Sequence, residues 1–242
     1  MKLMRRGYWL APALLLVVAG ASRAAAESAA TYASRIKSLV CVGEVVQRND
    51  AELKQMGSSF SQAYRFTGSS IWYEEPLKMR LESSAGKLKV TYIINGDRKK
   101  ASGAGLTKTW NIKGRPGRLQ TLSSLGLATP SWLALCKDRF LGTEVFKGRV
   151  VKVFELKYRD AMDGSYFRIS MDPETRTMPV MKVFSPEGKL KVTYHFVKPV
   201  KTQGLHIPTR IEVFSPRGIL CAVTEVRGII VDKPVDAGRF AF

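Results

Sequence analysis

The feature that most constrains the fold is a series of short segments in which apolar and polar residues alternate, separated by turn signals. The heptapeptide GKLKVTY shows the pattern twice, at residues 86–92 and 188–194. In an extended chain its leucine, valine and tyrosine share one side, and its lysines and threonine share the other. The apolar side of the two copies carries Leu88, Val90, Tyr92, Leu190, Val192 and Tyr194. Each copy follows a turn-like stretch, so each is predicted to be the return arm of a β-hairpin.

Segments of this kind recur through most of the chain. The predicted strands span residues 41–48, 59–66, 69–74, 77–83, 87–94, 97–101, 107–112, 143–158 (interrupted near 147–148), 165–172, 179–185, 189–197, 206–214 and 219–231. Short connections indicate antiparallel neighbours, because a parallel crossover needs a dozen or more residues. A sheet of about a dozen strands is expected to curl strongly or close up. The repeated VFSP-x-G, at 183–188 and 213–218, predicts two hairpins of one design.

Two segments depart from the strand pattern. Residues 30–39 have apolar residues at helical spacing, and residues 117–140 are predicted to form one or two short helices, with Pro130 at a helix start. So few helical residues can only fill or cap one curved sheet. The predicted fold class is therefore mainly β (α+β), a curved antiparallel sheet with short helices on its apolar face.

The first 26 residues have the pattern of a secretory signal peptide: a basic start, an apolar run from Tyr8 to Gly20, and Ala24-Ala25-Ala26 as a cleavage site. The alternative is a membrane anchor, but the apolar run is shorter than the ~20 residues that a spanning helix needs. We expect residues 27–242 to form a single soluble domain in the periplasm.

Positive charge dominates the chain, with a formal net charge of +19. Removal of residues 1–26 takes away four basic residues and no acidic one, which leaves +15. In a cytosolic protein, a positive charge of this size would suggest binding to nucleic acid. Export argues against nucleic acid and favours anionic lipid head groups, and the alternative is a solvated outer face of the sheet.

The sequence contains no catalytic or metal-binding motif. Its two histidines, His195 and His206, are eleven residues apart, and a lone histidine in a strand is more often a hydrogen-bonded or surface group than a ligand. We expect no enzyme activity, no cofactor and no metal site. The three cysteines, Cys41, Cys136 and Cys221, allow at most one internal disulfide, whose pairing the sequence does not determine. Cys221 lies in an apolar stretch and is expected to be a small core residue.

Alternation also predicts a broad apolar face on the sheet, to which Leu77, Met79, Leu81, Phe196, Ile211 and Val213 would add. If helices pack this face fully, it is an ordinary core. If they pack it loosely, it is a pocket for a long apolar ligand. The same choice applies to Trp132 in the helical segment, which would be either a lid residue at the mouth of the pocket or a fixed core residue.

Several short stretches together resemble the periplasmic lipoprotein-carrier (LolA-like) superfamily, the outer-membrane lipoprotein-sorting type. They are SIWYEEPLKMRLE at 70–82, IINGD at 93–97, MDPET at 171–175 with Met178-Pro179, HIPTRI at 206–211, and VDKPVD at 231–236 with Phe240. The resemblance implies an incompletely closed antiparallel β-barrel whose concave face is covered by helices and holds acyl chains. One position departs from the pattern, because Glu75 stands where lipoprotein carriers tend to have a basic residue.

Given this resemblance, the expected function is a non-enzymatic carrier that binds acyl chains of lipoproteins or lipids and moves them between envelope membranes. The expected lipid-binding residues are Trp72, Met79, Leu81, Leu88, Val90, Tyr92, Trp132, Leu133, Leu190, Val192, Tyr194, Phe196, Ile211 and Val213. Arg80, Lys87 and Lys89 are expected to contact anionic head groups. The expected partners are transient donor and acceptor proteins of the inner and outer membranes, with a monomeric carrier. A lipid- or stress-sensing module and a structural envelope protein with a filled core are the alternatives.

Overall fold

The computed structural model describes residues 27–160 and 164–242, and the predicted signal segment therefore lies outside the described residues. Thirteen strands form one antiparallel sheet in the order β6-β5-β4-β3-β2-β1-β13-β12-β11-β10-β9-β8-β7. The strands are β1 (Ser38–Arg48), β2 (Gly68–Glu74), β3 (Lys78–Ala85), β4 (Leu88–Asn95), β5 (Arg98–Gly103), β6 (Leu106–Asn111), β7 (Cys136–Phe146), β8 (Arg149–Tyr158), β9 (Tyr166–Met171), β10 (Val180–Phe184), β11 (Leu190–Thr202), β12 (Leu205–Phe214) and β13 (Leu220–Val231).

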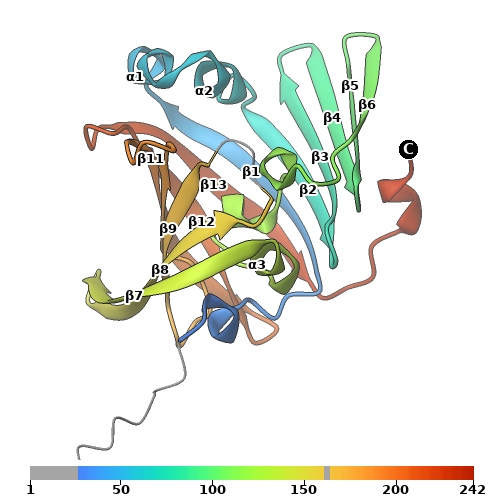
Figure 1. Ribbon diagram of the computed structural model, residues 1–242. Helices are drawn as coiled ribbons and strands as arrows, with labels where there is room; N and C mark the ends of the chain where they lie inside the picture. Colours follow the sequence, from blue (N-terminus) through green and yellow to red (C-terminus); the bar gives the residue numbers. More distant parts are fainter. Residues whose placement is uncertain (1–26, 161–163) are drawn as a thin grey trace, which may run out of the picture.

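The sheet is built outward from its centre, where the first strand pairs with the last. β1 lies between β2 and β13, and the chain runs strand by strand from β1 to one edge at β6. It then crosses to the opposite edge and returns from β7 to β13. The sheet curves around a concave face but does not close, because β6 and β7 remain its two edges (Figure 1). The predicted fold class, a mainly β and incompletely closed antiparallel sheet with short helices, is confirmed.

Residues 112–135, which we call the strap, make the crossing from β6 to β7 over the concave face (Figure 1). The strap contains η2 (Pro116–Arg118), η3 (Leu122–Leu125) and α3 (Pro130–Ala134). Its apolar side chains are buried against the sheet: Ile112, Leu122, Leu125, Leu127, Trp132 and Leu133. Gly126 lies so close to β11 that a Cβ there would be 2.5 Å from the Phe196 side chain, and its φ of 78° also favours glycine. The strap is therefore part of the core.

The remaining helices lie at the ends of strands. α1 (Asp50–Met56) and α2 (Ser58–Ala63) connect β1 to β2 at one end of the sheet, and η1 (Ala29–Tyr32) precedes β1. η4 (Ala237–Phe240) carries the C-terminal segment back over the outer, convex face of β3 and β4. Within the described residues, no helix is long and apolar enough to cross a membrane.

The two VFSP-x-G segments form identical turns, as predicted. In the β10–β11 turn, the Ser185 N–H donates to the Lys189 carbonyl (2.9 Å) and the Gly188 N–H donates to the Ser185 carbonyl (3.0 Å). In the β12–β13 turn, Ser215, Ile219 and Gly218 make the same pair of bonds, each at 2.9 Å. In both turns the serine Oγ accepts a further hydrogen bond from the backbone N–H of the residue just before the return strand, Lys189 or Ile219. Both copies of GKLKVTY are return arms, in β4 and β11.

Three local predictions were wrong. Residues 59–66, predicted as a strand, lie mostly in α2, because Gly57 ends α1 and the chain resumes a helical turn at once. The helix predicted over 30–39 is only the four-residue η1, and β1 already begins at Ser38. The helical prediction over 117–140 extended too far, because β7 begins at Cys136 and pairs with β8.

The three cysteines are free thiols and all are buried. Burial raises the pKa of the Cys41 and Cys136 thiols to about 12, and it also raises the pKa of the Cys221 thiol. Each of the three therefore stays protonated at neutral pH and packs as a small apolar residue.

Candidate functional site

A cavity of about 750 Å³ lies between the concave face of the sheet, α2 and the strap. Its size falls within the range of small-molecule binding sites. Its wall is apolar and aromatic, with a few neutral polar groups. The lining residues are Gly43, Val45, Ser59, Phe60, Ala63, Tyr64, Phe66, Ser69, Ile71, Leu81, Gly117, Gln120, Ser123, Ser124, Leu125, Met181, Tyr194, Ile211 and Thr224.

Strand pairing builds the floor of this cavity. In an antiparallel pair, residues directly opposite each other share a face of the sheet. Ile71 of β2 lies opposite Leu81 of β3, and on the other side of the sheet centre Ile211 of β12 lies opposite Thr224 of β13. Alternation therefore carries the same apolar face across the middle of the sheet.

One wall comes from α2, whose position depends on how α1 begins and ends. The Asn49 side chain caps α1 by accepting a hydrogen bond from the Glu52 N–H (3.2 Å). Gly57, with a φ of 125°, then turns the chain into α2. Phe60 and Tyr64 are four residues apart, so they project from one side of α2 into the cavity.

The strap supplies the opposite wall through Gln120, Ser123, Ser124 and Leu125. The Gln120 Oε1 atom is buried and has no hydrogen-bond partner among the described residues. An acceptor of this kind in a cavity wall is suited to a ligand that carries an O–H or N–H group. The mouth lies between the strap and α2, where Ser59, Ala63, Gly117 and Ser124 are exposed.

No charged side chain is present among the described residues that line this cavity. Burial raises the pKa of Tyr194 to about 12, and it raises the pKa of Tyr64 as well. Both phenols are therefore neutral at physiological pH. In a chain with a net charge of +19, a neutral cavity of this size favours an uncharged, largely apolar ligand.

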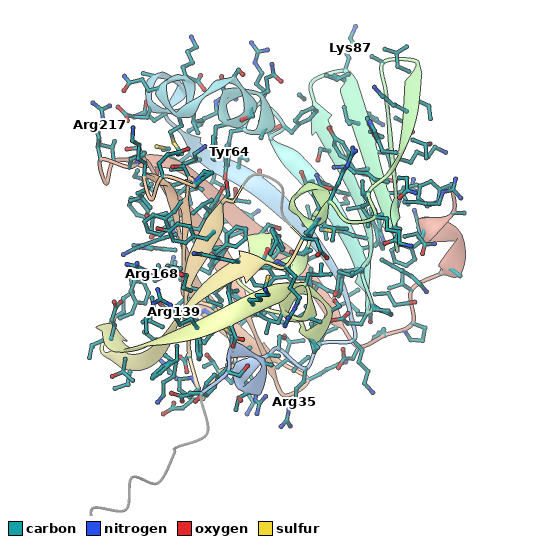
Figure 2. The ribbon with its side chains drawn as sticks, viewed as in Figure 1. Arg35, Tyr64, Lys87, Arg139, Arg168 and Arg217 are labelled. Atoms are coloured by element: carbon teal, nitrogen blue, oxygen red, sulfur yellow. The ribbon has the colours of Figure 1, made fainter. Side chains whose placement is uncertain are left out.

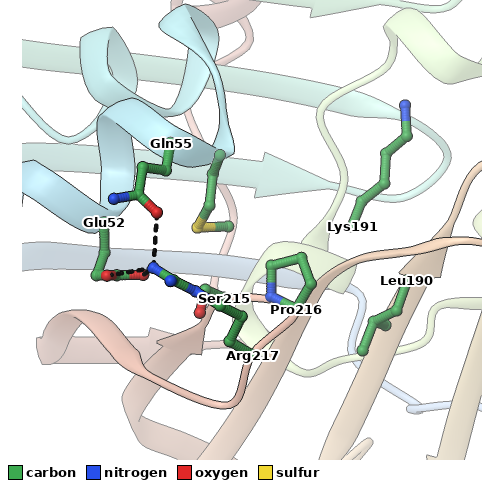
Figure 3. Close-up of a pocket in the computed structure, with 8 residues that line it drawn as sticks. Glu52, Gln55, Leu190, Lys191, Ser215, Pro216 and Arg217 are labelled. Carbon is green, nitrogen blue, oxygen red and sulfur yellow. Dashed lines mark hydrogen bonds and ion pairs between the residues drawn. The ribbon is translucent and has the colours of Figure 1, made fainter.

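A second cavity of about 350 Å³ lies beside α1, at the β12–β13 turn. Here the Arg217 guanidinium donates to both carboxylate oxygens of Glu52 (2.7 and 3.0 Å) and to the Gln55 Oε1 atom (2.6 Å), as Figure 3 shows. Glu52 is buried although it is charged, so the ion pair compensates for its lost hydration. Arg217 therefore ties α1 to the sheet.

The predicted lipid-binding residues separate into four groups in the structure. Leu81, Tyr194 and Ile211 line the main cavity, and Leu190 lines the smaller one. A second group is buried in the core around the cavity without lining it: Met79, Trp132, Leu133, Val192, Phe196 and Val213. The third group lies on the concave side of β4, outside the cavity: Leu88, Val90 and Tyr92. The fourth group is Trp72 alone.

Trp72 lies on the convex face, so the expectation that it faces the cavity was wrong. Its neighbours across the sheet are Val40 and Arg80, and the Arg239 guanidinium stacks on its ring, 5.0 Å from the centroid. The C-terminal segment covers this part of the convex face through Arg239, so the indole lies on the side of the sheet away from the cavity. Arg80 lies on the same face, where it pairs with Glu82 (2.6 Å).

Trp132 is a core residue that does not line the cavity. It is 1% exposed, and its indole N–H donates to the Tyr158 hydroxyl (3.1 Å). Its ring also meets Phe167 edge to face. Of the two roles left open by the sequence, the fixed core role is the one that this packing favours.

The Glu75 side chain contacts the strap. Its Oε1 atom accepts a hydrogen bond from the Ser131 N–H at the start of α3 (3.4 Å). Glu75 thus helps to hold the start of α3 near the C-terminal end of β2.

Sequence reasoning missed Phe60, Tyr64 and Gln120. A signal for α1 was present, because Asn49 is followed three residues later by Glu52, which is typical of a helix start. The serine-rich α2 and the irregular strap carry no comparable pattern, and only the three-dimensional structure brings them to the cavity.

Comparison with known proteins supports the fold. The sequence matches no family model and no curated protein. The structure is similar to that of a LolA superfamily protein from Nitrosomonas europaea, with a TM-score of 0.58 and 13% identity over 86% of this chain and 92% of that one. It is also similar to a domain from Vibrio parahaemolyticus described as an outer membrane lipoprotein-sorting protein, with a TM-score of 0.56 and 10% identity over 86% and 89% of the chains. A DUF1329 family protein from Desulfovibrio piger has a TM-score of 0.51 and 11% identity over 85% and 89%.

Proposed function

Because the chain has the LolA-like fold, we propose that it is a periplasmic carrier that binds the acyl chains of a lipid or lipoprotein and transfers them between envelope membranes. The observation that carries the proposal is the uncharged cavity of about 750 Å³ on the concave face. An acyl chain is long, flexible and apolar, and a cavity lined by Ile71, Leu81 and Ile211 would exclude water from it.

The polar groups of the cavity suit the other end of such a ligand. Gln120 Oε1 and the neutral hydroxyls of Tyr64 and Tyr194 could hydrogen-bond an ester, amide or hydroxyl group. None of these groups would repel an uncharged linkage. We therefore propose that the carboxyl end of the bound chain lies near the strap and α2.

The expected free energy of binding an acyl chain is small enough to allow its release. Each buried methylene contributes about 0.8 kcal/mol, so a chain of about 14 carbons gains roughly 11 kcal/mol. Association and ordering cost an estimated 4–15 kcal/mol. Binding of one chain is therefore reversible, and transfer requires no covalent step.

The test is binding of a fluorescent fatty-acid probe to a matched pair of variants. Val45 lines the cavity, whereas Val46, the next residue of β1, is 46% exposed and lines no part of it. Val45→Glu should weaken probe binding by roughly tenfold or more, because a carboxylate in an apolar wall is poorly hydrated. Val46→Glu should bind as the unmodified protein does.

Thermal unfolding of both variants checks that they are folded. Absence of probe binding by the unmodified protein would favour a structural protein with a filled core and would overturn the proposal. Equal binding by the two variants would place the ligand elsewhere. Transfer of the bound probe to acceptor vesicles then separates a carrier from a sensor, which would retain it.

A further inference from the structure

The free ends of two neighbouring hairpins form a surface that the proposed cavity does not use. We call residues 85–88 and 103–106 the wing tips, since they end the β3–β4 and β5–β6 hairpins. Ala85 pairs with Leu88, Val90 with Gly103, and Gly103 with Leu106, so the two tips lie side by side. In Figure 1 they extend from the sheet on the same side of the molecule as α1 and α2.

Both wing tips expose a leucine to solvent. Leu106 is 76% exposed, more than any other large apolar side chain that the structure describes, and Leu88 is 41% exposed. While these two leucine side chains face water, the favourable free energy of burying them is not gained. Contact with an apolar phase would recover it.

Positive charge surrounds these leucines. Residues 86–115 contain eight basic residues and one acidic residue, Asp97. Lys87, Lys89 and Lys108 are exposed, and no described carboxylate forms an ion pair with them or with Lys100. Figure 2 shows Lys87 at the end of the β3–β4 hairpin, directed away from the molecule.

The hairpin at the opposite edge of the sheet has exposed apolar residues with less positive charge around them. Val145 is 73% exposed at the β7–β8 turn, where Lys147 is exposed as well. Glu144 precedes Val145, however, and the nearby Arg149 is held by Asp172 (2.6 Å) and Glu174 (2.8 Å). Exposure alone therefore does not distinguish the wing tips. The wing tips differ in having three exposed lysines, Lys87, Lys89 and Lys108, around their leucines and no glutamate among residues 86–115.

We propose that the wing tips dock the protein on an anionic phospholipid bilayer. Leu88 and Leu106 enter the boundary between head groups and acyl chains, while the lysines contact lipid phosphates. A nucleic acid would use the positive charge but would leave the leucines in water, so the bilayer fits both features. The inference rests on the proposed acyl-chain carriage: docking at the wing tips brings the side of the molecule with α1 and α2 toward the membrane that gives or receives the chain.

The experiment is co-sedimentation of the purified protein with vesicles, either of phosphatidylcholine alone or of phosphatidylcholine mixed with phosphatidylglycerol. We expect binding to the mixed vesicles that weakens with added salt, and little binding to the neutral ones. Leu106→Glu and the double variant Lys87→Glu/Lys108→Glu should each weaken it by about tenfold or more. Val145→Glu serves as the matched control and should bind normally.

Equal binding to both kinds of vesicle, or an equal loss in Val145→Glu, would overturn the docking surface. Probe binding measured without vesicles keeps this result separate from the proposed function. Leu106→Glu should retain full probe binding, because Leu106 is outside the cavity. Loss of vesicle binding with intact probe binding supports docking at the wing tips. Vesicle binding by a protein that binds no probe would leave the docking surface in place and refute the carrier.

Discussion

Individual side chains in this protein perform different tasks according to how close they lie to the centre of the sheet, and the repeated heptapeptide shows this directly. In β11, Val192 is buried and Tyr194 lines the cavity. In β4, the corresponding Val90 and Tyr92 are only partly buried, and Tyr92 lies under the Lys99 ammonium group, 5.4 Å from its ring centroid. The same heptapeptide therefore contributes to the core and to the cavity wall in one copy and lies in the more exposed β3–β4 hairpin in the other.

The Trp132 side chain offers a test at the residue scale. Trp132→Ala should lower the free energy of unfolding by about 3–5 kcal/mol, because it removes a fully buried indole from the core. The dissociation rate of a bound fatty-acid probe should change little in the variant that remains folded, because Trp132 does not line the cavity. Denaturant unfolding and stopped-flow displacement of the probe measure the two effects. A small loss of stability with much faster release would show instead that Trp132 acts as a lid.

Whole elements were predictable where their residues alternate and uncertain where they do not. The strands from β2 to β6 and from β8 to β13 follow period-two patterns with glycine- or proline-containing turns, and the predictions located them. The α1–α2 pair and the strap contain only short helical turns, whose positions depend on tertiary contacts such as Gly126 against Phe196. These elements supply two walls of the cavity, so the candidate site was less predictable than the fold.

The link between α1 and the β12–β13 turn is testable at the element scale. Arg217→Ala removes the partner of the buried Glu52 carboxylate. Because Arg217 is 59% exposed, the loss of stability should be only about 1 kcal/mol. Probe release should nevertheless become faster, because α1 and the adjoining α2 would be held less firmly over the concave face.

Glu187 provides the matched control for that variant. It occupies the corresponding position in the β10–β11 turn, whose hydrogen bonds are the same as those of the β12–β13 turn. Glu187→Ala should leave both stability and release rate close to those of the unmodified protein. If Arg217→Ala releases the probe no faster than Glu187→Ala, α1 does not control access to the cavity.

The molecule as a whole has its charged and apolar regions on different surfaces. Basic residues lie on the convex face and around the wing tips, whereas the described lining of the main cavity is uncharged. The sequence indicated this division through alternation of lysine with leucine, valine and tyrosine. It did not reveal whether the apolar face was filled, because that depends on how closely the strap and α2 approach the sheet.

The most direct test of the central claim, that the concave cavity holds an acyl chain, is photocrosslinking with a diazirine-labelled fatty acid followed by peptide mass spectrometry. We expect crosslinks in two regions far apart in sequence, one at Phe60 and Tyr64 in and just after α2 and the other at Tyr194 in β11, because both regions line the cavity. Unlabelled long-chain fatty acid should suppress them. Crosslinks confined to the convex face around Trp72, or crosslinks that unlabelled fatty acid does not suppress, would contradict the claim.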